Sequence, residues 1–232
     1  MALDARNAVM KQMTVSTVML AVMMAVFYAS AGRTDIPRSW LLFGVSFVYF
    51  VGSALALARY NPELLVQRLT VRREGSKAWD EVLMRAGNLT GLLLVPAVAG
   101  LDVGRYGWSS LGMQYAVLGL VLMVVSSILI NWAMIENPYF EPTVRIQEDR
   151  GHRVVSTGPY GIVRHPGYLS GILWMSAIPL ILGSLYAFVP VILYSALMIL
   201  RTHLEDITLH EELAGYPEYA ERVRYRLLPG IW

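Results

Sequence analysis

The chain of 232 residues contains no cysteine. Disulfide bonds, thiolate-ligated metals, covalently attached haem and cysteine nucleophiles are therefore all excluded. Charged residues are also scarce, at 16% of the chain, and the formal net charge is only +2. The basic residues form local clusters between apolar blocks, without an accompanying aromatic platform. This pattern does not favour a nucleic-acid-binding protein.

The chain also lacks the sequence units of several function classes. It shows no strand, glycine-rich loop and helix with an acidic ribose partner, so a Rossmann-type cofactor site is not expected. Paired half-sequences with broken helices, which are typical of secondary transporters, are absent as well. Between the apolar blocks no polar segment is long enough to form a soluble domain with its own core. We therefore expect the function to reside at the membrane.

The sequence contains several long apolar runs. Hydrophobic residues make up 56% of the chain, and they fall in blocks of about 20 residues, the length of helix that crosses a bilayer. The first block, 14–31, is long for a cleaved signal peptide and is followed by further blocks, so we interpret it as a spanning helix. Spanning segments are predicted at 13–31, 40–58, 82–101 and 111–135, followed by a longer run at 168–200.

The last apolar run is too long for a single crossing. Pro179 and the Gly183-Ser184 pair interrupt it, which predicts two shorter helices joined by a tight turn. The expected fold is an all-α, polytopic transmembrane bundle of five to six spanning helices. Its C-terminal part is expected to contain a polar loop, a helical hairpin and a cytoplasmic helix.

The distribution of Lys and Arg predicts the orientation of this bundle. With six crossings and the N-terminus inside, only Arg33, Arg38 and Arg105 of the 19 basic residues lie on the outer side. The other sixteen lie at the cytoplasmic side, which is a strong positive-inside bias. The same topology brings residues 59–81, 136–166 and 201–232 together on the cytoplasmic face. Both termini and an active site built from these segments are therefore predicted to be cytoplasmic.

The first segment with candidate functional residues is the polar loop 151–171, which leads directly into an apolar helix. Gly158-Pro159 predicts a tight turn that presents Tyr160, and Pro166 is expected to start the helix just after Arg164 and His165. Backbone amides at the helix start favour an anionic group, and an arginine beside them can bind a carboxylate or phosphate.

The same loop also has a purely structural interpretation. Composition alone favours the functional and the structural interpretation equally. Arg164 would then be a basic residue at a cytoplasmic helix end. Gly167 and Gly171, four residues apart, leave one helix face free of side chains. That face can admit a ligand, or it can pack against a neighbouring helix.

The second segment, 201–219, continues the last apolar run into the cytoplasm. Helical spacing places Arg201 and Glu205 one turn apart on one face, with Asp206 beside them. These charges are either a solvated helix end or the lining at the mouth of a pocket. His203, Asp206 and His210 share a face as well, but three donors at this spacing, without a fourth, do not predict a metal site.

The two segments together follow one ordered pattern of motifs. A Gly-Pro-Tyr turn precedes an Arg-His-Pro-x-Tyr motif with a following Gly; after a helical hairpin come an Arg, a paired acid, a Leu and a Tyr-x-x-Tyr stretch. In this chain they are Gly158-Pro159-Tyr160, Arg164-His165-Pro166-Gly167-Tyr168 with Gly171, Arg201, Glu205-Asp206, Leu209, and Tyr216 to Tyr219. In this order the motifs resemble the isoprenylcysteine carboxyl methyltransferase and phospholipid methyltransferase family of integral membrane enzymes. The resemblance spans 137–232, and the chain departs from the usual Glu-Glu pair at Asp206.

The resemblance implies methyl transfer from S-adenosylmethionine to a lipophilic acceptor that arrives from the bilayer. It divides the chain into N-terminal membrane helices, 1–136, and a catalytic region, 137–232. Arg201 and Glu205 are the expected catalytic residues. The expected cofactor-binding residues are Gly158, Pro159, Tyr160, Arg164, His165, Tyr168, Gly171, Glu205 and Asp206. No metal site and no nucleic-acid partner are expected, and the partners are a lipophilic substrate and membrane lipids.

Several alternatives remain at this level. The acceptor group is open among a prenylcysteine-type carboxylate, a lipid amine and a thiol, and the oligomeric state is equally open. The ending 223–232 also looks like the close of membrane sterol reductases, so an NADPH-dependent reductase is the alternative enzyme. A non-enzymatic lipid-binding or transport protein is the third class. Few basic residues stand near the glycine turn, which disfavours a dinucleotide phosphate.

Overall fold

The computed structural model describes residues 2–69 and 75–232, and these residues form helices and loops without any strand. Five helices are long and apolar enough to cross a membrane. They are α1 (Ala2–Ala31), α2 (Pro37–Tyr60), the continuous helix Ala78–Tyr106, α6 (Met113–Glu136) and α8 (Phe188–Glu212). Shorter helices are α3 (Pro62–Arg68), α7 (Pro166–Leu182) and α9 (Tyr216–Arg222). The predicted all-α, polytopic membrane bundle is confirmed.

The continuous helix Ala78–Tyr106 contains α4 (Ala78–Leu89) and α5 (Val95–Gly100), separated by a π-helical turn. Pro96 explains the turn, because proline has no N–H to donate inside a helix and a wider turn absorbs the missing bond. A second π-helical turn ends at Gly107, which adopts a φ of +61°. The helix is thus longer than the predicted segment 82–101, yet its backbone remains continuous.

The predicted C-terminal hairpin is confirmed, but one of its two predicted breaks is wrong. α7 ends at Gly183, whose φ of +84° stops the helix, and the amides of Gly183 and Ser184 both donate to the Pro179 carbonyl at 2.9 Å. Pro179 itself stays inside α7, where it is buried. A helical proline removes only one backbone hydrogen bond, and here the surrounding apolar packing keeps the helix intact.

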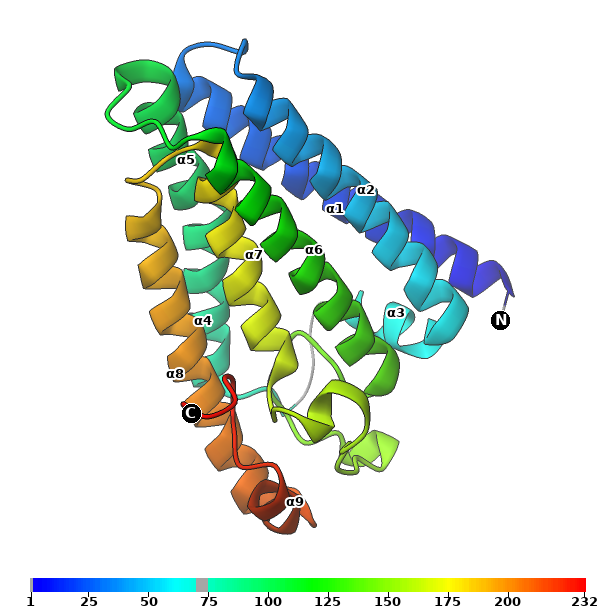
Figure 1. The fold of residues 1–232 in the computed structure, drawn as a ribbon. Helices are drawn as coiled ribbons and strands as arrows, with labels where there is room; N and C mark the ends of the chain where they lie inside the picture. Colours follow the sequence, from blue (N-terminus) through cyan, green and yellow to red (C-terminus); the bar gives the residue numbers. More distant parts are fainter. Residues whose placement is uncertain (1, 70–74) are drawn as a thin grey trace.

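The helices pack in three groups (Figure 1), and small residues let them approach closely. α1 and α2 lie side by side along one flank, α6 and α7 occupy the middle, and α4 and α8 form the other flank. Ser126 of α6 and Ser170 of α7 hydrogen-bond to each other's backbone carbonyls at 2.8 and 3.0 Å. A Cβ on Gly104 would lie 2.3 Å from the Ala31 Cβ of α1. Such close contacts between small residues are typical of helix packing in membranes.

The two ends of the bundle differ in chemistry. At one end, buried Asp102 accepts hydrogen bonds from Ser109 and Ser184, which ties the α7–α8 turn to the helix Ala78–Tyr106. At the other end the segments 59–81, 136–166 and 201–232 meet, as the Lys77–Glu212 ion pair at 2.6 Å illustrates. The predicted convergence of these segments is confirmed for the described residues. Arg72 and Arg73, which belong to the predicted cytoplasmic cluster, lie outside the described residues.

Candidate functional site

A cavity of about 300 Å³ opens at the polar end of the bundle. Its walls come from the segment after α6, from the start of α7, from α8 and from α9. Seven of the predicted site residues line it: Tyr160, Arg164, His165, Tyr168, Gly171, Arg201 and Glu205. The structure therefore brings together residues from both motif-bearing segments, although these are separated by the α7–α8 hairpin.

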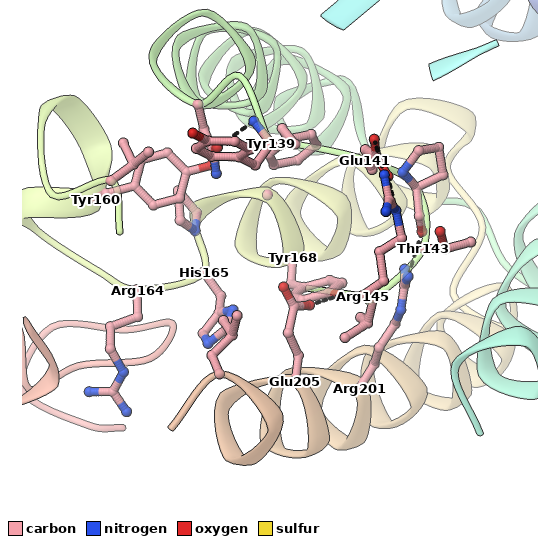
Figure 2. A pocket seen from close by; sticks show the side chains of 18 of the residues that line it. Tyr139, Glu141, Thr143, Arg145, Tyr160, Arg164, His165, Tyr168, Arg201 and Glu205 are labelled. Atoms are coloured by element: carbon pink, nitrogen blue, oxygen red, sulfur yellow. Dashed lines mark hydrogen bonds and ion pairs between the residues drawn. The ribbon is translucent and has the colours of Figure 1, made fainter. Parts of the chain in front are cut away.

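Tyr168 and Glu205 lie next to each other in the lining of this cavity (Figure 2). Pro166 begins α7, as predicted, and this places Tyr168 in the first turn of the helix. The Tyr168 hydroxyl donates a hydrogen bond to a Glu205 carboxylate oxygen from α8. One turn earlier on α8, the Arg201 guanidinium stands over the Tyr168 ring, 5.2 Å from its centroid. A carboxylate, an aromatic ring and a cation thus share one wall of the cavity.

Arg201 is a buried cation with partners on the protein. Its Nε donates to Asp80 Oδ1 at 2.6 Å, and its Nη2 donates to the Pro142 carbonyl at 2.6 Å. Arg201 is 7% exposed and Asp80 is fully buried. A buried charge requires such a partner because the loss of hydration costs several kcal/mol. Arg201 is therefore held in one position at the cavity wall.

Asp206 lies outside the cavity lining and is the centre of a separate ion cluster. Its two carboxylate oxygens accept from Arg164 Nε and Nη2 at 2.8 and 2.9 Å, from Arg226 Nε at 2.7 Å and from the Tyr216 hydroxyl at 2.9 Å. His165 Nε2 lies 3.1 Å from the same carboxylate. The cluster joins the loop before α7 to α8 and to the C-terminal segment.

Arg164 donates hydrogen bonds to several protein acceptors in and beside this cluster. Its third guanidinium nitrogen, Nη1, donates to the carbonyls of Val223 and Arg224 at 2.8 Å. Burial opposes the charge of Arg164, but the hydrogen bonds and ion pair with Asp206 outweigh it, so the pKa of the guanidinium is raised. All three nitrogens thus bond within the protein, and these bonds hold the loop against α8 and the C-terminal segment.

The turn before Arg164 presents Tyr160 as the sequence predicts. Gly158 has a φ of +57°, and residues Gly158–Gly161 form a 3-10 turn in which Pro159 and Tyr160 are buried. Gly158 and Pro159 lie outside the cavity lining, whereas Tyr160 is part of it. The Tyr160 hydroxyl accepts from the Asn137 side chain at 3.2 Å, and burial raises its pKa. The glycine and the proline therefore shape the backbone, and the tyrosine contributes the cavity surface.

Gly171 makes room for an aromatic ring in the cavity wall. A Cβ on Gly171 would lie 3.0 Å from the Tyr194 hydroxyl of α8, and a Cβ on Gly167 would lie 2.5 Å from the Phe140 ring. Tyr194 and Phe140 both line the cavity. The two glycines thus let neighbouring rings, instead of their own side chains, form the wall.

Comparison with known proteins relates part of this chain to one family. Residues 117–211 match the isoprenylcysteine carboxyl methyltransferase (ICMT) family. The match covers 95 of the 232 residues, and these form the ICMT region of the chain. The whole chain also resembles a solved structure described as the eukaryotic intramembrane Ras methyltransferase ICMT, with 17% sequence identity and a TM-score of 0.54. That likeness covers 91% of this chain and 74% of the other, and it extends the shared fold into the N-terminal helices. No curated protein matches the sequence.

The five apolar helices and the likeness to the ICMT fold indicate an integral, multi-pass membrane protein. The ICMT region contains every site residue that the sequence motifs single out. It does not contain Asp80, or Tyr216 and Arg226 of the Asp206 cluster. Segments on both sides of the ICMT region therefore complete the site.

The segment between α6 and the Gly158 turn carries site residues that the motifs do not reveal. The Glu141 side chain has no exposed surface and accepts from Arg145 Nε at 2.9 Å. The His152 and Tyr139 rings are in tilted contact, with 4.4 Å between their centroids, and His152 Nδ1 accepts from the Gln147 amide at 3.3 Å. Burial lowers the pKa of His152 to about 4, so the ring is neutral near pH 7. The only sequence signal is a polar stretch after an apolar helix, which does not identify individual residues.

The His203, Asp206 and His210 set does not converge. His203 is exposed, and His210 Nδ1 lies 2.9 Å from the Asp206 carbonyl oxygen of its own helix. Within residues 2–69 and 75–232, no group of three His, Asp or Glu side chains is arranged to hold a metal ion. The chemistry of the cavity therefore has to be argued from Glu205, Arg201 and the aromatic rings.

Proposed function

We propose that this protein transfers a methyl group from S-adenosylmethionine to a lipophilic acceptor at the membrane. The observation that carries the proposal is the wall made by Glu205, Tyr168 and Arg201 in a cavity within the ICMT region. In that wall a carboxylate and an aromatic ring suit a cationic cofactor, and a neighbouring guanidinium suits a polar acceptor group.

The residues of the cavity fit S-adenosylmethionine. Glu205 and the rings of Tyr160 and Tyr168 offer negative charge and aromatic faces to a sulfonium. The N-terminal turn of α7 and His165 offer donors for the carboxylate of the cofactor. Gly158, Pro159, Arg164 and Asp206, which the family resemblance also implies, act by shaping and holding the loop. When bound, the cofactor supplies an electrophilic methyl group.

The protein's own contribution is alignment and exclusion of water. In-line displacement requires the reacting atoms to lie about 3 to 3.5 Å apart in an ordered site. The buried Arg201, fixed by Asp80 and Pro142, is placed to orient a polar acceptor group. A carboxylate acceptor is already ionised, whereas an amine or thiol must lose a proton, for which Glu205 or His165 in the cavity lining is the proposed base.

The acceptor is proposed to be lipophilic because the cavity extends into the bundle. Ile130 of α6 and Tyr194 and Met198 of α8 line it, and both helices are long and apolar enough to span the bilayer. An acyl or prenyl chain fits such a wall better than water does. The acceptor group itself is proposed to be a prenylcysteine-type carboxylate, a lipid amine or a thiol.

The site and both termini are proposed to be cytoplasmic. This orientation is supported by the sixteen basic residues that the predicted topology places at the polar end, against Arg33, Arg38 and Arg105 at the other. Reporter fusions at residue 232 and in the segment around Arg105 should give opposite sides. The same side for both would contradict the topology.

Binding of S-adenosylhomocysteine tests the proposed function. Calorimetric titration of the detergent-purified protein should detect S-adenosylhomocysteine and should detect no binding of NADPH. Glu205→Gln should weaken the affinity by at least several-fold, since a charge-assisted hydrogen bond is worth about 1.5 to 3 kcal/mol. Glu81→Gln, which removes an exposed carboxylate paired with Arg85, is the matched control and should change nothing.

The outcomes separate the three function classes. Binding of NADPH in place of S-adenosylhomocysteine would indicate a reductase, and binding of neither would favour a lipid-binding protein. Transfer of labelled methyl groups should then be measured on a panel of lipophilic carboxylates, amines and thiols. Rates that do not depend on acyl or prenyl chain length would rule out a lipophilic acceptor.

A further inference from the structure

Asp80 is a buried carboxylate that belongs to no motif of the ICMT region. It lies in the first turn of α4, fully buried, and it is not part of the cavity lining. Its two oxygens have two different partners. Oδ1 accepts from Arg201 Nε at 2.6 Å, and Oδ2 accepts from the Val144 amide at 2.8 Å. One side chain thus joins α4 to α8 and to the segment that follows α6.

Both partners of Asp80 are parts of the cavity wall. Arg201 and Val144 line the cavity, as does Pro142, whose carbonyl holds the second nitrogen of Arg201. The ring of Tyr168 faces the same guanidinium. Asp80 therefore lies outside the cavity, next to the lining residues. Its bond to Arg201 holds the guanidinium in place relative to Tyr168 and Glu205.

The segment 140–144 also accepts hydrogen bonds from residues that precede the ICMT region in the sequence. Arg68 Nη1 donates to the Phe140 carbonyl at 3.0 Å, and the Lys77 amide donates to the Val144 carbonyl at 3.1 Å. With the Asp80–Val144 bond, these contacts fix the wall through Arg68, Lys77 and Asp80. The position of the wall depends on a part of the chain that the ICMT region does not include.

We propose that Asp80 is a positioning residue that fixes Arg201 for orientation of the acceptor group. The proposal rests on the proposed function, because it assigns Arg201 to the acceptor. Asparagine cannot replace Asp80, since both oxygens accept hydrogen bonds from N–H donors. In Asp80→Asn one of these donors would meet the amide NH₂ group, and the charge that holds the guanidinium would be lost.

Asp102 provides a matched control on the same continuous helix. It is also fully buried and accepts hydrogen bonds from Ser109, Ser184 and the Tyr186 amide, at the opposite end of the bundle from the cavity. Asp80→Asn and Asp102→Asn therefore remove the same charge from the same depth of burial. Only the first touches a residue of the cavity wall.

The experiment measures methyl transfer by the full chain in nanodiscs, together with calorimetric affinity for S-adenosylhomocysteine. Asp80→Asn should raise the KM for the acceptor about tenfold or more, the loss expected for a charge-assisted contact, and leave the cofactor affinity within about twofold. Asp102→Asn should leave both unchanged, although it lowers stability. In an Arg201→Lys background, Asp80→Asn should have a much smaller effect on KM, because the residue acts through Arg201.

Each outcome decides the proposal. An acceptor KM that Asp80→Asn leaves unchanged, or shifts by the same factor with and without the Arg201→Lys substitution, would overturn it. If Asp80→Asn does not fold, Asp80→Glu retains the charge but displaces it by one methylene. It should then raise the acceptor KM without altering cofactor affinity, and an unchanged KM would again overturn the proposal. Absence of cofactor binding and methyl transfer in the unmodified protein would instead reject the proposed function.

Discussion

The Asp206 cluster makes a strong prediction about stability. Asp206 is 1% exposed and bonds to Arg164, Arg226 and Tyr216. Asp206→Asn keeps the shape but removes the charge that two arginines share. Breaking a buried ion pair by removing one partner typically costs about 3 to 5 kcal/mol. Arg164 retains two carbonyl acceptors and Arg226 is partly exposed, so we expect a loss of about 3 kcal/mol, the lower end of that range.

The assay is reversible unfolding in mixed micelles, followed by circular dichroism, with limited proteolysis of the segment 223–232. Because Arg164 binds the carbonyls of Val223 and Arg224, loss of its carboxylate partner should also expose this segment to protease. Asp149→Asn is the control, since the Asp149 side chain is 61% exposed in its ion pair with Arg145 and ion pairs at the surface contribute about 1 kcal/mol or less. A stability for Asp206→Asn within about 1 kcal/mol of the unmodified protein would refute the ion-cluster interpretation.

Two further predictions concern pH and packing. Since burial lowers the pKa of His152 to about 4, its stabilising contribution is complete above the usual value of 6.5 and is lost as pH falls toward 4. Unfolding measured at pH 7.5 and 5 should show a loss of up to about 2 kcal/mol that His152→Gln removes; equal pH dependence in both proteins would contradict this. Gly104→Ala should destabilise the bundle by about 1 to 3 kcal/mol, because its Cβ would overlap Ala31. Gly44→Ala, whose Cβ would have no neighbour within 4 Å, should be nearly neutral, and equal effects of the two variants would argue against this α1 contact.

The sequence predicts those parts of the fold that depend on local chemistry. Apolar length gives the spanning helices, because hydrocarbon leaves backbone groups no partner outside the helix. Pro166 starts α7 because proline suits the first turn, and Gly183 ends it because a positive φ favours glycine. Helical spacing also places Arg201 and Glu205 on one face, where both line the cavity.

The choice of partner for each charge cannot be predicted in the same way. Arg164 has the same local sequence whether it meets a ligand or a carboxylate 42 residues away, and the structure gives it Asp206. Asp80 carries no signal at all, because it is one of two adjacent acids, with Glu81, before an apolar run and its partner Arg201 is 121 residues distant. Long-range pairing depends on how the helices pack, and the packing of apolar surfaces in lipid has little residue-specific pattern.

The contacts of the cavity also bear on the division of the chain at residue 137. Residues 137–232 contain the motifs, but Arg201 is held by Asp80 and the segment 140–144 by Arg68 and Lys77. A fragment restricted to 137–232 would leave the buried Arg201 without its carboxylate, which is unfavourable in any low-dielectric site. The N-terminal helices are therefore part of the site's structure, and substitutions near α4 are expected to alter acceptor handling although they lie far from the motifs in sequence.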